Sequence, residues 1–347
     1  MTSEPLIIRA VSPEDWPETS QQFCDLTHEQ SLTYSIAAAA RVGARAEFMS
    51  IETAAGTPLA AMSARVRKIP GLGRGIAWIP SGPLILSGHG CSPGIETLEV
   101  VLDALRNHYV RKAGHILRLR LPLPVNSQVG WVGDVALRGF ALMEQATPYR
   151  TVLIDLTEPE DTLWKNLHGK WRNPLRNAMR SGIGIDYLPF AEGYARFLPL
   201  YDQVRQAKGF EPDIGPGFYK DLTGPDFEHD TLIAHKDGSD IGAITIGRTG
   251  RSAVYLFGAT PEIGRKLNAG HLLMWQAILH AAKQGCEWLD LGGISETDNP
   301  SVARFKRRTG GDEVTASGPY EARAEGMASA SILMAEQLVK WYRGNRR

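Results

Sequence analysis

The chain has 347 residues, of which 43% are hydrophobic and 22% are charged. This composition is typical of a folded globular protein and excludes disordered, collagen-like and coiled-coil chains. The 38 cationic side chains are balanced by 38 anionic ones, so the chain lacks the cationic excess with which proteins hold long nucleic acid. The length favours two domains of ordinary size over one unusually large core.

The cysteines and histidines give no sign of a metal site. Cys24, Cys91 and Cys286 lie too far apart in the sequence to indicate a disulfide framework or a zinc site. The nine histidines lack the spacing of metal ligands, so we expect no bound metal. The first residues lack the basic region of a signal peptide, and no run of about 18 apolar residues occurs. We therefore expect a cytoplasmic protein without integral membrane association.

Strand-like and helix-like stretches alternate along the chain. Short apolar or alternating runs bounded by glycine or proline predict strands, and longer stretches with a helical period predict helices. The order strand, strand, helix, strand predicts an α/β fold with mixed sheets in each half. In chain order, we expect strands at 59–62, 78–83 and 116–121 with a helix at 98–112, then strands at 150–155, 241–246, 254–258 and 288–291 with a helix at 271–283.

The expected elements and glycines of the two halves coincide when one half of the sequence is shifted along the other. The glycines that end the two expected helices, Gly114 and Gly285, lie 171 positions apart, as do the later glycines Gly139 and Gly310. A repeat of about half the chain predicts two similar domains in tandem. We place the first domain at residues 1–148 and the second at 149–322.

A C-terminal helix is expected at residues 323–343. Its apolar residues recur at spacings of three and four and form one stripe. Because such a stripe needs a partner surface, we expect this helix to fold back onto the first domain and complete it. The stripe consists of Met327, Ala330, Met334, Leu338 and Trp341.

A basic stretch at residues 165–182 opens the second half. Five cations occur there with no acidic residue between Asp161 and Asp186. Asn173 can cap a helix that has Pro174 in its first turn, which would bring arginines and backbone amides together in a geometry suited to phosphate. The alternative is an ordinary solvated basic face. The five cations are Lys165, Lys170, Arg172, Arg176 and Arg180.

A second candidate site combines a Gly-Gly turn with a lysine. The strand at 288–291 runs directly into Gly292 and Gly293, a place where the backbone must come close to a ligand or to another chain segment. Phe305 would anchor the following segment in the core, while Lys306 could stabilise a developing oxyanion. The alternative is that the cations at 304–308 only solvate a helix. Tyr255 is either a core aromatic residue or a hydroxyl that faces the site, and the histidines of the helix at 271–283 are more typical of surface or core positions.

Taken together, these segments resemble the Fem family of peptidyltransferases. The resemblance covers nearly the whole chain and depends on the order and spacing of its motifs. They are, in chain order, Gln30-Ser31, residues 79–83 (Ile-Pro-Ser-Gly-Pro), 149–156, 163–164, Lys170-Trp-Arg-Asn173, 176–178, Gly182, Tyr255-Leu-Phe-Gly-Ala259, Asp290-Leu-Gly-Gly293, Phe305-Lys306 and Gly310-Gly311.

The resemblance implies two tandem acetyltransferase-like (GNAT) domains. It also implies transfer of an amino acid from aminoacyl-tRNA, which is the donor substrate, to an amine of a peptidoglycan precursor or related peptide, with no cofactor. In this family the lysine of the Phe-Lys motif, here Lys306, stabilises the carbonyl oxyanion, and we take Tyr255 as the second catalytic candidate. We expect substrate contacts from Lys170, Arg172, Arg176, Tyr219, Gly292, Gly293 and Phe305.

Two other functions stay open. An acyl-CoA N-acyltransferase would use the same fold, with acetyl-CoA as donor. However, the segment 265–270 has Asn268 where the pyrophosphate loop of such enzymes has its first glycine, which disfavours a close backbone approach. A non-catalytic binding protein on this fold is the third possibility. The donor amino acid, the acceptor and the oligomeric state are left open by the sequence.

Overall fold

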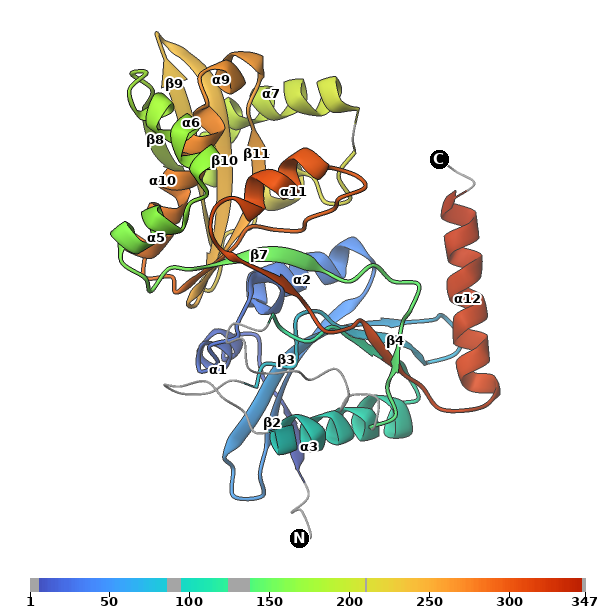
Figure 1. Ribbon diagram of the computed structural model, residues 1–347. Coiled ribbons are helices and arrows are strands. Elements are labelled where there is room, and N and C mark those ends of the chain that lie inside the picture. The colour runs from blue at the N-terminus through green and yellow to red at the C-terminus, as the bar shows by residue number, and fades with distance from the viewer. Residues whose placement is uncertain (1–5, 86–94, 124–137, 210, 345–347) are drawn as a thin grey trace. The chain divides into compact units, whose positions relative to one another are not determined.

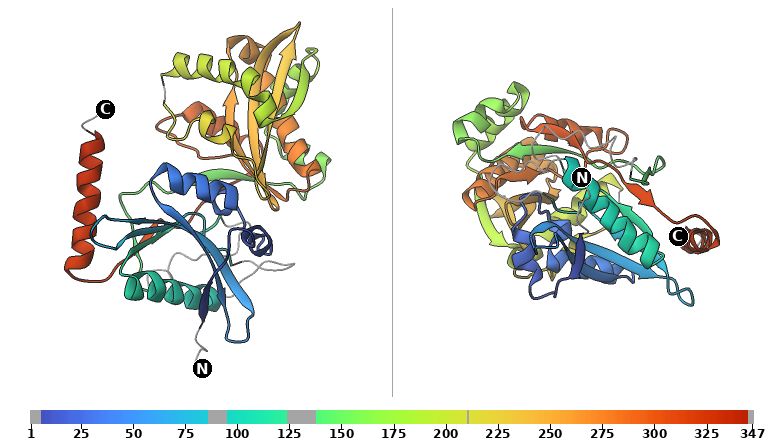
Figure 2. Two further views of the ribbon diagram at one scale, coloured as in Figure 1. Left: turned by 180° about the vertical axis from the view of Figure 1, so that it is seen from behind. Right: turned by 90° about the horizontal axis from the view of Figure 1, so that it is seen from below.

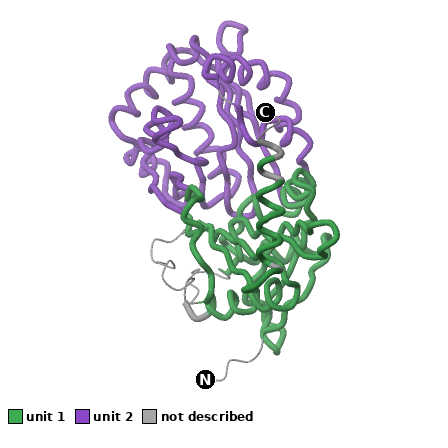
Figure 3. Tube along the Cα trace, turned by 90° about the vertical axis from the view of Figure 1, so that its right-hand side faces the viewer, with its two compact units in different colours: residues 1–148, 316–347 green, residues 149–315 purple. Residues whose placement is uncertain are grey.

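The computed structural model describes residues 6–85, 95–123, 138–209 and 211–344. The chain forms two compact units, one of residues 1–148 with 316–347 and one of residues 149–315 (Figure 3). This division differs at one point from the sequence-based boundary, which places residues 316–322 in the second domain. The strand Tyr320–Ala322 (β14) pairs with two strands of the first unit, and this pairing assigns the segment to that unit.

Unit 1 is built on a seven-stranded sheet with the order β1-β2-β3-β4-β5-β14-β6. Its elements follow the chain until β6, and the last strand and helix return after unit 2 (Figure 1). Besides β14, the strands are β1 (Ile7–Ala10), β2 (Arg45–Glu52), β3 (Pro58–Lys68), β4 (Gly75–Ile79), β5 (Ile116–Leu119) and β6 (Ala141–Leu142). The helices are α1 (Trp16–Gln21), the 3-10 turn η1 (His28–Gln30), α2 (Leu32–Arg41), α3 (Ile95–Leu105), its π-helical continuation η2 (Arg106–Lys112) and α12 (Met327–Gly344).

Unit 2 has a seven-stranded sheet with the order β13-β7-β12-β11-β10-β9-β8. All of its elements come from one continuous segment. The strands are β7 (Arg150–Asp155), β8 (Gly184–Pro189), β9 (Glu228–Lys236), β10 (Ser239–Thr249), β11 (Ser252–Ala259), β12 (Trp288–Asp290) and β13 (Asp312–Thr315). The helices are α5 (Glu160–Asn166), α6 (Gly169–Met179), α7 (Phe190–Lys208), α8 (Pro216–Lys220), α9 (Glu262–Lys266), α10 (Ala269–Lys283) and α11 (Pro300–Arg307).

The two sheets share one pairing pattern, which confirms the expected mixed α/β fold. Four antiparallel strands lead to a parallel pair, β4 with β5 in unit 1 and β11 with β12 in unit 2. The repeated glycines have the same backbone in both copies: Gly114 and Gly285 have φ values of 67° and 81°, and Gly139 and Gly310 have 74° and 88°. A side chain is strained at such left-handed positions. This explains why both repeats have glycine at these two equivalent positions.

The same offset reveals a reciprocal exchange of strands. It relates β6 to β13 and β7 to β14. Strand β7 follows the last strand of the first repeat, yet it lies in the sheet of unit 2 between β12 and β13. Strand β14 follows the last strand of the second repeat and lies in the sheet of unit 1 between β5 and β6. The strand that follows each repeat therefore lies in the sheet of the other unit.

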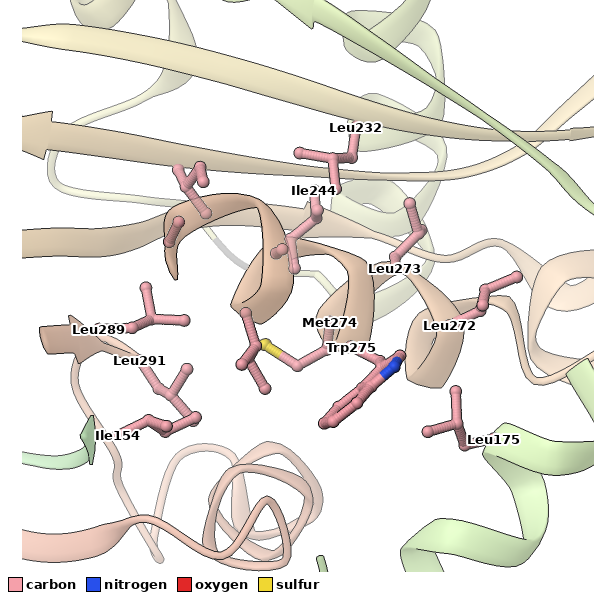
Figure 4. Close-up of a cluster of buried hydrophobic side chains, with 14 of the residues drawn as sticks. Ile154, Leu175, Leu232, Ile244, Leu272, Leu273, Met274, Trp275, Leu289 and Leu291 are labelled. Carbon is pink, nitrogen blue, oxygen red and sulfur yellow. The ribbon is translucent and has the colours of Figure 1, made fainter. Parts of the chain in front are cut away.

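Helices cover both faces of the unit 2 sheet. The face that carries Leu232 and Ile244 packs against α10, whose Leu273 and Trp275 are among its buried residues (Figure 4). The opposite face packs against α7, where a Cβ at Gly193 would lie 3.0 Å from Thr231. Successive residues of β9, Thr231 and Leu232, thus face different helices, as the pleat of a strand requires.

Helix α12 belongs to unit 1 but uses the face opposite to the predicted one. Arg118 of β5 donates two hydrogen bonds of 2.8 Å to the Glu336 carboxylate, and Ile332 is fully buried. The apolar stripe points away from this contact, with Met334, Leu338 and Trp341 each 65% exposed. The expectation that the stripe itself packs on unit 1 is therefore wrong.

Two further sequence expectations concern covalent bonds and membranes. Cys24 is disulfide-bonded, which the spacing of the cysteines does not predict, whereas Cys286 is a free, buried thiol. In the part of the chain that the structure describes, no helix has the length and apolarity needed to cross a membrane.

Candidate functional site

Lys306 lies buried on α11, with 5% of its surface exposed. Its Nζ donates hydrogen bonds to the backbone carbonyls of Gly292, at 3.1 Å, and Gly293, at 3.0 Å. It also lies 5.1 Å from the centre of the Tyr255 ring, a cation–π geometry. Burial lowers the pKa of this lysine to about 8, while the negative charge of Asp290 opposes the shift. At pH 7 the side chain is thus an ammonium ion that is largely shielded from solvent.

The Gly-Gly turn that holds Lys306 is itself held by Asp290. One oxygen of this carboxylate accepts the backbone N–H of Gly292 at 2.8 Å and the hydroxyl of Thr151, and the other accepts the Tyr149 hydroxyl at 2.8 Å. Gly292 has a φ of +73°, and a Cβ there would lie 2.9 Å from the carbonyl oxygen of Tyr255. Only glycine therefore fits, and Asp290 fixes the two carbonyls that orient the lysine.

A cavity of about 520 Å³ opens beside Lys306 within unit 2. Tyr255, Phe305 and Lys306 line it, so the structure brings these three predicted site residues together. Burial raises the pKa of the Tyr255 phenol above its usual range, so this residue is a neutral hydroxyl at pH 7. Of the described residues that line the cavity, none is an aspartate or a glutamate.

The first turn of α10 lines the same cavity and differs from the sequence expectation. Asn268 caps this helix with φ and ψ values of 59° and 27°, the left-handed conformation that glycine adopts most easily. The backbone N–H groups of Ala269 and Gly270 have no carbonyl partner within the helix because they belong to its first turn. Arg265 and Lys208 line the cavity as well. The asparagine therefore does not prevent a close backbone approach to an anion here.

His271 of α10 faces the cavity from an aromatic cluster. Its ring centre lies 5.0 Å from that of Trp171 on α6 and 5.0 Å from that of Phe305 on α11. Burial lowers its pKa to about 4, so the imidazole is neutral at pH 7. Sequence reasoning missed this residue, because a histidine in an apolar helix has the same pattern whether it faces a core or a cavity.

The predicted phosphate-binding cations lie on α6, outside the residues that line the cavity. The helix begins earlier than expected: the His168 ring accepts the Lys170 N–H at 3.1 Å as its cap, and Pro174 lies inside the helix. Trp171 and Leu175 turn into the core, which leaves Lys170 and Arg176 exposed and Arg172 half-buried. In the described part of the chain none of these three cations forms an ion pair, and the Arg176 guanidinium lies 5.7 Å from the Trp164 ring centre.

Tyr219 is separate from these groups. It is buried in α8, where its ring packs against Phe227, His229 and Phe257, and it does not line the cavity. Nor do the described residues contain a cluster of three histidine, cysteine or acidic side chains that could hold a metal ion.

One family model matches the segment of the chain that carries this site. Residues 169–307 match the family model described as an acetyltransferase (GNAT) domain, a segment that begins with α6 and ends just after Lys306. No curated protein matches the sequence.

Similar solved structures cover nearly the whole chain. A crystal structure of FemX superposes with a TM-score of 0.76 at 14% identity, covering 96% of this chain and 99% of that one. The C-terminal domain of a putative lysylphosphatidylglycerol synthetase from Agrobacterium fabrum gives a TM-score of 0.52 at 13% identity, covering 94% and 98%. A conserved protein of unknown function from Bacteroides thetaiotaomicron gives 0.57 at 11%, covering 92% and 100%. The chain therefore has the fold of the FemX structure, and its residues 169–307 match the acetyltransferase (GNAT) domain model.

Proposed function

We propose that the protein is a Fem-type acyltransferase that moves an amino acid from aminoacyl-tRNA to an amine of a peptidoglycan precursor or a related peptide. The observation that carries the proposal is the placement of Lys306. An ammonium ion has three N–H donors, and the carbonyls of Gly292 and Gly293 take two of them. The third can donate to a carbonyl oxygen bound in the cavity that Lys306 lines.

Attack of an amine on an acyl carbonyl places negative charge on that oxygen. A preorganised donor at this point stabilises the charge by about 3 kcal/mol, or roughly 10²- to 10³-fold in rate. Because the donor nitrogen is already oriented by two carbonyls, little reorganisation is needed when the charge develops. The ring of Tyr255 lies 5.1 Å from the ammonium and helps to hold it in this position through a cation–π contact.

The α6 cations support a nucleic-acid donor. Lys170, Arg172 and Arg176 are unpaired by acids in the described structure, and Trp171 on the same helix contacts the Phe305 and His271 rings beside the cavity. We propose that these cations hold phosphates of the tRNA acceptor end, and that the reaction takes place in the cytoplasm, where charged tRNA is found.

A second candidate is an acyl-CoA-dependent N-acyltransferase. It is favoured by one observation, the left-handed Asn268 at the start of α10 with Arg265 and Lys208 nearby. Together these groups present amides and cations suited to a pyrophosphate.

One experiment separates the two candidates. The purified protein is incubated with charged tRNA or with acetyl-CoA, each with nucleotide-linked and free stem peptides as acceptors. We expect acylation from charged tRNA, and Lys306→Met should lower turnover about 10²- to 10³-fold with donor binding nearly unchanged. Lys283→Met, an exposed lysine on α10, is the matched control. Transfer from acetyl-CoA alone would reject the tRNA-dependent reaction, and full turnover by Lys306→Met would reject the role of the lysine.

A further inference from the structure

Acyl transfer to an amine requires a proton to move, and Lys306 does not account for it. The amine nitrogen bonds to the carbonyl carbon and becomes positively charged while the carbonyl oxygen becomes negative. The adduct then collapses: the bond to the leaving oxygen or sulfur breaks, and the amide forms. For the balance to close, the nitrogen must lose one proton and the leaving group must gain one. A group that accepts the first proton and returns it to the leaving group serves both steps.

The groups that line the cavity leave one candidate for this role. Lys208, Arg265 and Lys306 are cations and have no lone pair to accept a proton while charged. Tyr255 is a neutral phenol at pH 7, because burial raises its pKa. With no carboxylate among the described lining residues, the imidazole of His271 is the neutral nitrogen base that remains.

The surroundings of His271 keep it available. Burial lowers its pKa to about 4, and no charged neighbour contributes to the shift. In the described structure neither ring nitrogen has a hydrogen-bond partner, and the ring is held by edge contacts with Trp171 and Phe305. The ring nitrogens of His271 are not among the described buried side-chain atoms that lack a partner, a set that does include both ring nitrogens of His229. The nitrogens of His271 therefore keep accessible surface, and a substrate in the cavity that this residue lines can reach them.

We propose that His271 is the proton acceptor of the acyl transfer, taking the proton that the attacking amine loses and delivering it to the leaving oxygen or sulfur. This inference rests on the acyl transfer proposed above and holds for either donor, since both release the same proton. A weakly basic imidazole suffices, because the amine nitrogen becomes much more acidic once it is bonded to the carbonyl carbon. The oxyanion formed nearby also favours the protonated ring.

The test compares two acceptors and two variants. His271→Phe keeps the aromatic packing without a nitrogen, and His271→Asn keeps a polar group without a base. Each is assayed from pH 6 to 9 with a peptide amine and with hydroxylamine, whose weakly basic nitrogen loses its proton more readily. We expect kcat for the peptide amine to fall about 10²- to 10⁴-fold in both variants and to rise with hydroxide concentration up to about pH 8, where Lys306 begins to lose its proton. The loss with hydroxylamine should be much smaller, and the donor KM should stay unchanged.

His280→Asn on the same helix is the control, since His280 bonds to Asp230 and does not line the cavity. Circular dichroism verifies that each variant is folded. Wild-type rates in both His271 variants, or an equal and pH-independent loss with both acceptors, would overturn the proton-acceptor role and leave a packing role. A wild-type protein that acylates neither amine from either donor would overturn the proposed function, and this inference with it.

Discussion

Lys306 shows how a few backbone atoms can keep a buried side chain charged. Removing an ammonium from water disfavours its charge, and this burial lowers its pKa to about 8 from the usual 10.5. Two carbonyl oxygens and the Tyr255 ring replace part of the lost hydration. The negative charge of Asp290 acts in the same direction and raises the pKa. The pKa of Lys306 therefore lies close to neutral pH, so a small rise in pH removes its charge.

This balance predicts how activity depends on pH. Lys306 loses its proton in the folded protein as the pH rises through about 8, so the wild-type rate should fall above that pH. In the unfolded chain this lysine keeps its proton up to the usual pKa of 10.5. The free energy of unfolding should therefore increase as the pH rises from about 8 to 10.5. Asp290→Asn removes the charge that favours the ammonium and should move the alkaline fall of kcat to lower pH.

A kcat–pH profile of the variant provides the measurement. Glu192→Gln, which replaces an exposed acid on α7, is the control and should keep the wild-type profile. An unchanged alkaline limb in a folded Asp290→Asn variant would show that Lys306 does not govern it.

Residues of the site differ in how far the sequence reveals them. Lys306 and Phe305 are found because they form a motif, although charge alone does not separate Lys306 from its cationic neighbours. The use of Asp290 is harder to foresee, since it depends on Tyr149 and Thr151, about 140 positions earlier. The role of His271 cannot be predicted from the sequence, because the residues around it belong to α6 and α11 and no local sequence pattern indicates that contact.

At the scale of elements, α6 combines a buried and a charged face. Trp171, Leu175 and Ala178 recur at spacings of four and three and fix the helix on the core. The cations follow on the remaining surface. The sequence identifies the charges but misplaces the start of the helix, because the ring of His168 rather than the Asn173 side chain supplies the cap.

Reversing two of these charges tests their role in donor binding. The double variant Arg172→Glu/Arg176→Glu should bind charged tRNA more weakly, and the weakening should be greatest at low salt. The slope of log affinity against log salt should decrease by about one for each phosphate that the variant no longer binds. Binding titrations at several salt concentrations measure both effects, with Lys283→Glu at the exposed end of α10 as control. Equal affinities for wild type and variant would show that the α6 cations form an ordinary solvated face and do not bind the donor.

Helix α12 illustrates a different limit of sequence patterns. The apolar stripe predicts a helix correctly, yet the contact with unit 1 is made by Ile332 and by the ion pair of Glu336 with Arg118. Periodicity reports which residues share a face. It does not report which face a distant strand such as β5 will meet.

At the scale of the whole molecule, the exchange of β7 and β14 determines which parts of the chain are self-sufficient. Unit 2 contains every strand of its sheet within residues 149–315, and its first and last strands pair through Arg150 and Thr315. Unit 1 lacks the strand between β5 and β6 until residues 320–322 are present. The repeat foretells two similar domains, but the exchange rests on strand pairing, which a repeat does not encode.

This topology predicts the behaviour of fragments. The fragment of residues 149–315 should fold alone and unfold cooperatively, because it carries a complete sheet and its own core. The fragment of residues 1–148 should be markedly less stable, because β5 loses a hydrogen-bonded neighbour. Thermal unfolding followed by circular dichroism compares the two. A stable, cooperative fragment 1–148 would contradict the importance of β14.

The exchanged strand also sets an order of assembly during translation. Domains usually fold in the order in which they leave the ribosome, the N-terminal one first. Here the segment that completes the earlier unit, β14, is synthesised after every strand of the later one. The later unit can thus be complete while the earlier one still lacks its last strand, and a chain that ends near residue 316 would carry a finished unit 2 joined to an unfinished unit 1.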